Sequence, residues 1–195
     1  MSQLLPFMLF AFVASITPGP TNILVLSNSS RFGVAAAVPI ILGACATAAL
    51  MVLLAGLGFG AWLLGHPQLQ QVMSWLGVAW LLYLAWQIAN SPTEPLEASA
   101  ATRQLGALGA AGLQLVNPKT WMMALAVISV FSDADADVDR YAVHALLFFL
   151  IALPCLAVWA LLGAGATKLL HSAARMRWFN YAMALLLVVS AVLSV

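Results

Sequence analysis

The sequence predicts an all-α membrane protein: six transmembrane helices in two inverted three-helix repeats, with the first helix of each repeat broken near the membrane midplane. Of its 195 residues, 64% are hydrophobic and only 7% are charged, against about 25% charged in a typical soluble domain. Residues 32–93 contain no Asp, Glu, Lys or Arg. As one helix they would run about 93 Å, about three times the hydrocarbon thickness. The chain must therefore cross a bilayer and return, which excludes a soluble protein or a nucleic-acid binder with basic patches.

Six apolar stretches are long enough to span a membrane, and polar or turn-rich segments separate them. None shows the residue alternation of an outer-membrane β-strand. The first stretch is too long for the apolar core of a secretory signal, and no Lys or Arg precedes it, so we expect it to be retained. The predicted spans are residues 4–29, 37–62, 69–89, 105–131, 142–166 and 178–195.

The Lys and Arg residues of the connections predict the orientation of the chain, because cytoplasmic connections carry an excess of positive charge. The connections after the first, third and fifth spans hold five such residues, whereas the opposite side holds only Arg140. This asymmetry places the three basic connections in the cytoplasm and both termini on the other side. The five residues are Arg31, Arg103, Lys168, Arg175 and Arg177.

The two halves of the chain share a proline motif. The first span contains Thr17-Pro18-Gly19-Pro20 and the fourth contains Asn117-Pro118-Lys119, so that similar breaks lie 100 residues apart. Since each half would have three spans, a repeated half must insert upside down, as in transporters with inverted repeats. We therefore expect one transmembrane transporter domain over residues 1–195, with pseudo-repeats 1–90 and 103–195 and a linker at 91–102.

We interpret each break as the start of a half-helix. Thr17 and Asn117 are capping residue types, and each precedes a proline suited to the first helical position. Two helix N-termini would then point free amides at a shared central site, which suits a carboxylate. The alternative is a pair of proline kinks that only shape helix packing.

Lys119 is the only charged residue inside a predicted span. A cation at a helix centre costs about 2.5–3.5 kcal/mol on insertion scales, and such residues usually face a cavity. We expect Lys119 to contact a substrate carboxylate or to bond carbonyls freed by the break; alternatively, a shallow or re-entrant segment 105–115 would leave it at an interface. The candidate substrate-binding residues are Thr17, Pro18, Gly19, Pro20, Thr21, Asn22, Asn117, Pro118 and Lys119.

These motifs resemble the LysE/RhtB family of amino-acid exporters, which includes lysine and homoserine/threonine exporters. Residues 17–20, 117–119 and 77–84 carry the resemblance, which covers essentially the whole chain. Residues 18–24 and 85–93 are most similar to the branch that exports cysteine and O-acetylserine. The resemblance implies a bacterial inner-membrane exporter of small neutral amino acids (cysteine, O-acetylserine, homoserine/threonine class), driven by proton antiport. The basic connections then place both termini in the periplasm.

The sequence departs from the family pattern in the second span. Many members carry an Asp shortly after a Gly there, but here Gly43 is followed by Ala44-Cys45-Ala46. The missing carboxylate argues against a basic substrate such as lysine, and it also removes the obvious proton carrier. Lys119, His144 and Glu94 remain as options for that role.

Cys45 and Cys155 allow one alternative function, a transmembrane thiol/disulfide electron carrier. In such a carrier we would expect the cysteines in the broken helices, which contain none. Three scattered histidines form no metal or nucleophile site, and the acidic run 133–139 lacks the Gly and Glu of a calcium loop. We therefore expect no enzyme, cofactor or metal. The expected partners are a small amino-acid substrate and the lipid bilayer, without nucleic acid; a homo-oligomer stays open.

Overall fold

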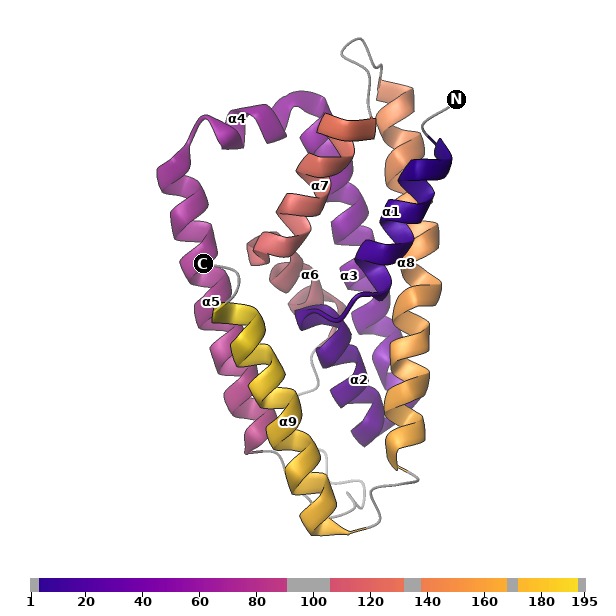
Figure 1. Cartoon of the computed structure of the whole chain (residues 1–195), viewed down its shortest axis with the longest axis vertical. Coiled ribbons are helices and arrows are strands. Elements are labelled where there is room, and N and C mark those ends of the chain that lie inside the picture. Colours follow the sequence, from indigo (N-terminus) through magenta and orange to yellow (C-terminus); the bar gives the residue numbers. More distant parts are fainter. Residues whose placement is uncertain (1–3, 91–105, 132–137, 168–171, 193–195) are drawn as a thin grey trace.

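The computed structural model describes residues 4–90, 106–131, 138–167 and 172–192, and within these ranges all regular structure is helical (Figure 1). The predicted linker 91–102, Glu94, Arg103, Lys168 and most of the acidic run lie outside the described residues. The helices are α1 (Leu4–Ile16), α2 (Pro20–Phe32), α3 (Val34–Leu54), a π-helical turn (Ala55–Phe59), α4 (Gly60–Leu64), α5 (Pro67–Ala89), α6 (Ala107–Val116), α7 (Pro118–Phe131), α8 (Val138–Thr167) and α9 (Ala173–Val192).

The described helices confirm an all-α membrane protein. Three of them are long and apolar enough to cross a bilayer: Val34–Leu64, Pro67–Ala89 and Val138–Ala166. A fourth span forms if Leu4–Ile16 and Pro20–Phe32, which are bent by 52°, count as one broken helix. The described parts of α6, α7 and α9 do not meet the same criteria of length and composition. The six-span count and the inverted repeat therefore stay predictions.

The second predicted span, residues 37–62, is not one straight helix. Gly58 has a φ of 100°, in the left-handed region that only glycine enters readily. The long helix α3 ends at Leu54, before this turn. The short helix α4 then runs in a different direction from α3 at the upper end of the bundle (Figure 1). The chain then turns back into α5 at Pro67, which occupies the first turn of that helix.

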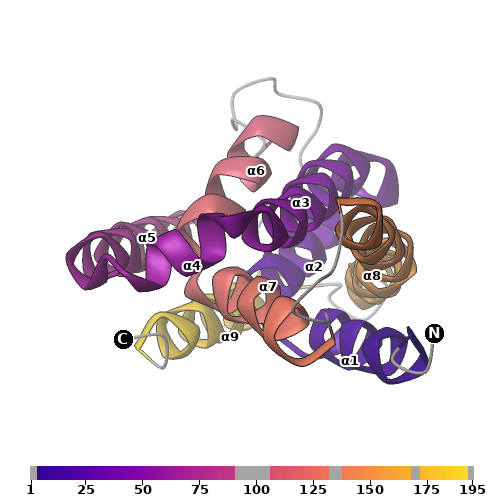
Figure 2. The ribbon, with the colours of Figure 1, turned by 90° about the horizontal axis from the view of Figure 1, so that it is seen from above.

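The helix pairing joins the two halves of the chain. The unbroken helices pair as α3 with α8 and as α5 with α9. The first broken helix, α1 with α2, packs on α8, and the second, α6 with α7, packs on α3. Seen from above, α5 and α9 lie together on one side, with α2 and α7 between them and α8 (Figure 2). A two-fold relation between the halves would give this pairing.

Two hydrophobic clusters fill the interior. The larger cluster joins α1, α3, α7 and α8 and includes Phe7, Met51 and Phe148; the smaller joins α5 and α9 around Leu81 and Leu187. The half-helices α2 and α6 contribute side chains to both clusters. The half-helices α2 and α6 therefore lie where the two clusters meet.

Small residues let two of these helix pairs approach closely, as is common in membrane helices. A Cβ added at Gly163 of α8 would overlap the Leu26 carbonyl oxygen and the Ser29 hydroxyl of α2. A Cβ at Gly43 of α3 would overlap the Ala107 backbone at the start of α6. Both glycines therefore hold a broken helix against its neighbour.

Candidate functional site: a polar cavity between two broken helices

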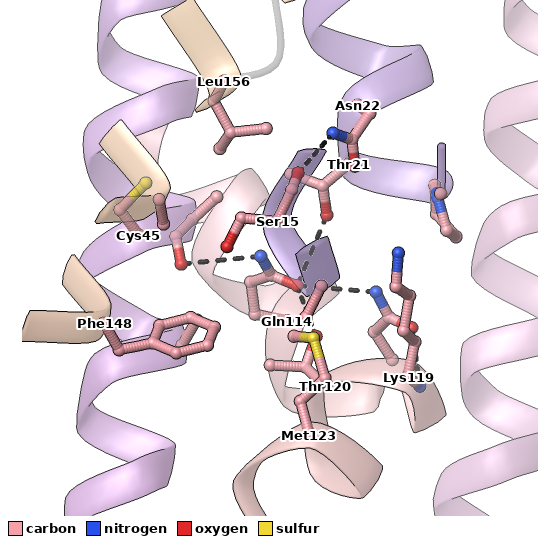
Figure 3. A pocket seen from close by; sticks show the side chains of 17 residues that line it. Ser15, Thr21, Asn22, Cys45, Gln114, Lys119, Thr120, Met123, Phe148 and Leu156 are labelled. Carbon is pink, nitrogen blue, oxygen red and sulfur yellow. Dashed lines mark hydrogen bonds between the residues drawn. The ribbon is translucent and has the colours of Figure 1, made fainter. Parts of the chain in front are cut away.

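A cavity lies where the two broken helices meet α3 and α8 (Figure 3). Its volume is about 40 Å³, enough for a few water molecules. Ala152 and Leu156 of α8 form part of its apolar wall, together with Phe148 one turn earlier. Six of the predicted residues line it: Gly19, Pro20, Thr21, Asn22, Asn117 and Lys119.

At the first break, the second half-helix starts at a different residue from the one predicted. The helix α2 begins at Pro20, not at Pro18, and its N-cap residue is Gly19 with extended backbone (φ −165°, ψ 178°). The reason is steric, because the residue before a proline is disfavoured in helical conformation. Thr17 is consequently not the N-cap of α2. Its hydroxyl instead donates to the Val13 carbonyl at 2.6 Å and closes the end of α1.

The carbonyls freed at the end of α1 find side-chain donors. The side-chain amide of Asn22 donates to the Ser15 carbonyl at 2.9 Å, and the Trp159 indole donates to the Ile16 carbonyl at 3.1 Å. The Lys119 ammonium donates to the Thr17 carbonyl at 3.2 Å. Irregular backbone inside a membrane protein needs such partners, because lipid offers none. Side chains of α2, α7 and α8 therefore stabilise the break by hydrogen bonds to its backbone carbonyls.

We expect Trp159→Phe to lower the free energy of unfolding by about 1 kcal/mol, because the Ile16 carbonyl loses its donor while the ring is retained. Thermal unfolding of the detergent-solubilised chain measures the effect. Trp178→Phe is the matched control, since Trp178 is 74% exposed. Equal stability of the Trp159 variant and wild type would contradict this role.

The second break follows the prediction. The helix α7 begins at Pro118, and the Asn117 side chain caps it by accepting from the Lys119 amide at 3.1 Å. The Thr120 amide donates to the Asn117 carbonyl at 3.0 Å. The first amides of α7 are thus already bonded. The expectation that both half-helices offer free amides is wrong for α7.

The first half-helix does offer free amides. The backbone N–H groups of Thr21 and Asn22 have no hydrogen-bond partner among the described residues, and both residues line the cavity. The second half contributes a cation instead. The Lys119 ammonium lies over Gly19, where an added Cβ would be 2.9 Å from Nζ. Both halves therefore contribute positive charge to the cavity. The first half contributes the free backbone amides of α2, and the second contributes the Lys119 ammonium.

Gln114 is the residue that sequence reasoning missed. It lies in the last turn of α6, is 6% exposed, and links both halves of the chain. Its Oε1 accepts from the Thr120 hydroxyl at 2.8 Å, and the Thr21 hydroxyl lies 3.4 Å away. A sequence signal existed, because Gln114 lies three residues before Asn117 and hence on the same helix face.

Several predicted residues lie elsewhere. Thr17 and Pro18 are exposed and do not line the cavity, although the Thr17 carbonyl bonds Lys119. The side chain of Pro118 is outside the described residues. His144 is 3% exposed and contacts the ring of Phe7, away from the cavity.

Neither cysteine forms a disulfide. Cys45 lines the cavity, whereas the Cys155 thiol lies 3.9 Å from the Phe12 carbonyl. Among the described residues no group of His, Cys, Asp or Glu could hold a metal ion.

An all-helical membrane protein with broken helices meeting at a polar, cation-bearing cavity has the design of a transporter with a central binding site. The family model described as LysE type translocator matches residues 12–195. The chain belongs to the LysE family of amino-acid efflux transporters.

Curated relatives support the same family. The cysteine/O-acetylserine efflux proteins of Salmonella choleraesuis and Salmonella paratyphi A are each 31% identical over 190 residues, covering 95% of this chain and 94% of the relative. The cysteine/O-acetylserine efflux protein of Escherichia coli O1:K1 is 30% identical over 188 residues with the same coverage. No solved structure matches the chain with comparable significance.

Proposed function

We propose that this chain exports small neutral amino acids of the cysteine, O-acetylserine and homoserine/threonine class across the bacterial inner membrane. Both termini face the periplasm in this proposal, because the basic connections lie on the cytoplasmic side. The chain moves its substrate unchanged and is not an enzyme. The names of the curated relatives support this substrate class.

One observation carries the proposal: a single cavity holds the free amides of Thr21 and Asn22 and the Lys119 ammonium, and none of its lining residues is acidic. Free amides at a helix N-terminus and a nearby ammonium both favour a carboxylate. The ammonium donates to the Thr17 carbonyl, which a substrate carboxylate would replace as the stronger acceptor. A basic side chain would find no countercharge.

The position of the missing acidic residue supports a neutral substrate. Ala44 and Cys45, which follow Gly43 at the place where the family resemblance leads us to expect an Asp, both line the cavity. The α3 wall is therefore apolar where a carboxylate could have paired a cationic side chain. A small neutral side chain can lie against this wall without burying an unpaired charge.

Export is coupled to proton entry in this proposal. His144, Lys119 and Glu94 are the candidate carriers. The buried His144 ring has its Nδ1 2.8 Å from the Arg140 carbonyl, and its Nε2 has no partner among the described residues. Net substrate efflux from preloaded proteoliposomes, with and without an imposed pH gradient, tests the coupling. Transport that ignores both the gradient and a protonophore would contradict it.

Export from cells loaded with cysteine, O-acetylserine or homoserine tests the function itself. We expect wild type to raise the external concentration of at least one of these amino acids above that of cells with an empty vector. Lysine is the matched cationic substrate and should stay inside. Absence of export for all three neutral amino acids would contradict the proposal.

The double variant Cys45→Ala/Cys155→Ala separates export from electron transfer by a thiol pair. Both cysteines are buried, Cys45 in the α3 wall of the cavity, and alanine replaces each with a small apolar side chain at a small loss of packing. We expect the double variant to retain at least about half of wild-type export. Complete loss of activity, together with cysteine-dependent reduction of an external disulfide, would favour the electron carrier.

A further inference from the structure

The Gln114 carboxamide has an unbalanced set of hydrogen bonds. Three donors converge on its Oε1: the hydroxyls of Thr120 at 2.8 Å and Thr21 at 3.4 Å, and the Asn117 amide at 3.5 Å. An amide oxygen has two lone pairs and cannot serve three donors well. Its Nε2, with two N–H groups, donates to a single acceptor among the described residues, the Ala44 carbonyl at 3.5 Å. The nitrogen therefore has donor capacity to spare inside the cavity.

The neighbouring backbone fixes the orientation of this amide. The backbone N–H of Lys119 can only donate, so the side-chain oxygen Oδ1 of Asn117 must face it. The side-chain nitrogen Nδ2 of Asn117 then faces Gln114. That NH₂ group needs an acceptor, which places Gln114 Oε1 beside it. Gln114 Nε2 consequently faces the Ala44 carbonyl, which can only accept.

A second polar group in the same cavity has no partner. The Ser15 hydroxyl oxygen is buried without a hydrogen bond among the described residues, and Ser15 is 8% exposed. Figure 3 shows the side chains of Ser15, Thr21 and Gln114 gathered from α1, α2 and α6. A buried hydroxyl without a partner is costly, and a ligand that bonds it removes the cost.

We propose that Gln114, with Ser15 beside it, is the specificity-determining residue that contacts the substrate side chain, accepting neutral polar groups and rejecting cationic ones. This inference rests on the proposed function. With the carboxylate at Lys119 and the α2 amides, a hydroxyl, thiol or ester carbonyl on the side chain lies between Ser15 Oγ and Gln114 Nε2. A side-chain ammonium there would face the Gln114 N–H groups and find no carboxylate among the lining residues.

The proposal predicts discrimination between a polar side chain and its apolar isostere. The pairs are homoserine with norvaline and cysteine with 2-aminobutyrate. In proteoliposomes with the full chain, we expect wild type to move the polar member of a pair about tenfold faster, because buried polar groups reject an analogue that leaves them unpaired. In Gln114→Met, which keeps the side-chain length, the ratio should fall close to one. Since it is a ratio, it does not depend on the amount of folded protein.

Gln114→Glu tests the charge preference. The change is isosteric and turns the donor end of the side chain into a carboxylate, so we expect a gain of lysine exchange and a loss of homoserine exchange of about tenfold. Gln87→Glu is the matched control, because Gln87 is exposed on α5 and outside the cavity. It should keep the wild-type substrate order.

The outcomes separate the two proposals. Wild type that moves none of the three neutral amino acids refutes the proposed function. Wild type that moves them, with the same polar-to-apolar ratio in Gln114→Met as in wild type, refutes the role of Gln114 alone. A folded Gln114→Glu variant that still excludes lysine also refutes it. If that variant does not fold, the Gln114→Met ratio decides.

Discussion

Lys119→Ala is expected to reduce export by about 10- to 100-fold, because hydrogen bonds to charged groups contribute about 1.5–3 kcal/mol. Among the residues that the structure describes, the ammonium is the only charged group lining the cavity, and it lies over the first break. Its loss removes the cation that holds the substrate carboxylate and also frees the Thr17 carbonyl. Initial rates of homoserine or cysteine export, corrected for the amount of membrane-inserted protein, measure the effect.

The control for Lys119→Ala is Arg177→Ala, which removes a cation from the exposed start of α9. We expect export by this variant to match that of wild type. If Lys119→Ala also exported at the wild-type rate, Lys119 would serve neither the substrate nor the break, and the proposed carboxylate site would be wrong.

Gly163→Ala is expected to destabilise the fold by about 1–3 kcal/mol, the usual cost of overpacking a tight contact. The added methyl would overlap the Leu26 carbonyl oxygen and the Ser29 hydroxyl, and the Leu26 carbonyl belongs to rigid helix backbone. The helices α8 and α2 must then separate, which also displaces the wall of the cavity. Thermal unfolding in detergent should show a lowered midpoint.

Gly165 provides the matched control for Gly163, since it lies two residues further along the same helix and no described residue lies within 4 Å of an added Cβ. Gly165→Ala should leave stability unchanged or raise it slightly, because alanine is the better helix former. Equal midpoints for the two variants would mean that α8 and α2 are not in close contact at Gly163.

The sequence predicts the elements of this fold well and their contacts poorly. Composition and apolar length identify the helices, because a chain in lipid must satisfy its backbone within each helix. The proline motifs locate both breaks to within a few residues. The start of α2 was misplaced because two prolines compete, and Pro20 forces Gly19 out of helical conformation. The Gly58 turn was missed, since glycine in an apolar stretch also suits close packing.

The candidate site likewise contains residues that the sequence predicts and residues that it does not. Lys119 and the residues after each break were predicted, because charge and proline are conspicuous in an apolar sequence. Gln114 and Ser15 were not, because each is one polar residue in an apolar helix, and only the folded chain places them together. For the α8 wall of the cavity, the sequence shows only the four-residue spacing of Phe148, Ala152 and Leu156. Any buried helix face shows this spacing, so it does not predict a cavity wall.

Binding of an amino acid and of its amide to the purified chain tests the central claim most directly. If the cavity binds a carboxylate through Lys119 and the free amides of α2, calorimetry should show homoserine or cysteine binding at least about tenfold more tightly than the corresponding amide. Lys119→Ala should reduce that difference, because only the free backbone amides of α2 then bind the carboxylate. Equal affinity of wild type for the acid and the amide would contradict the account.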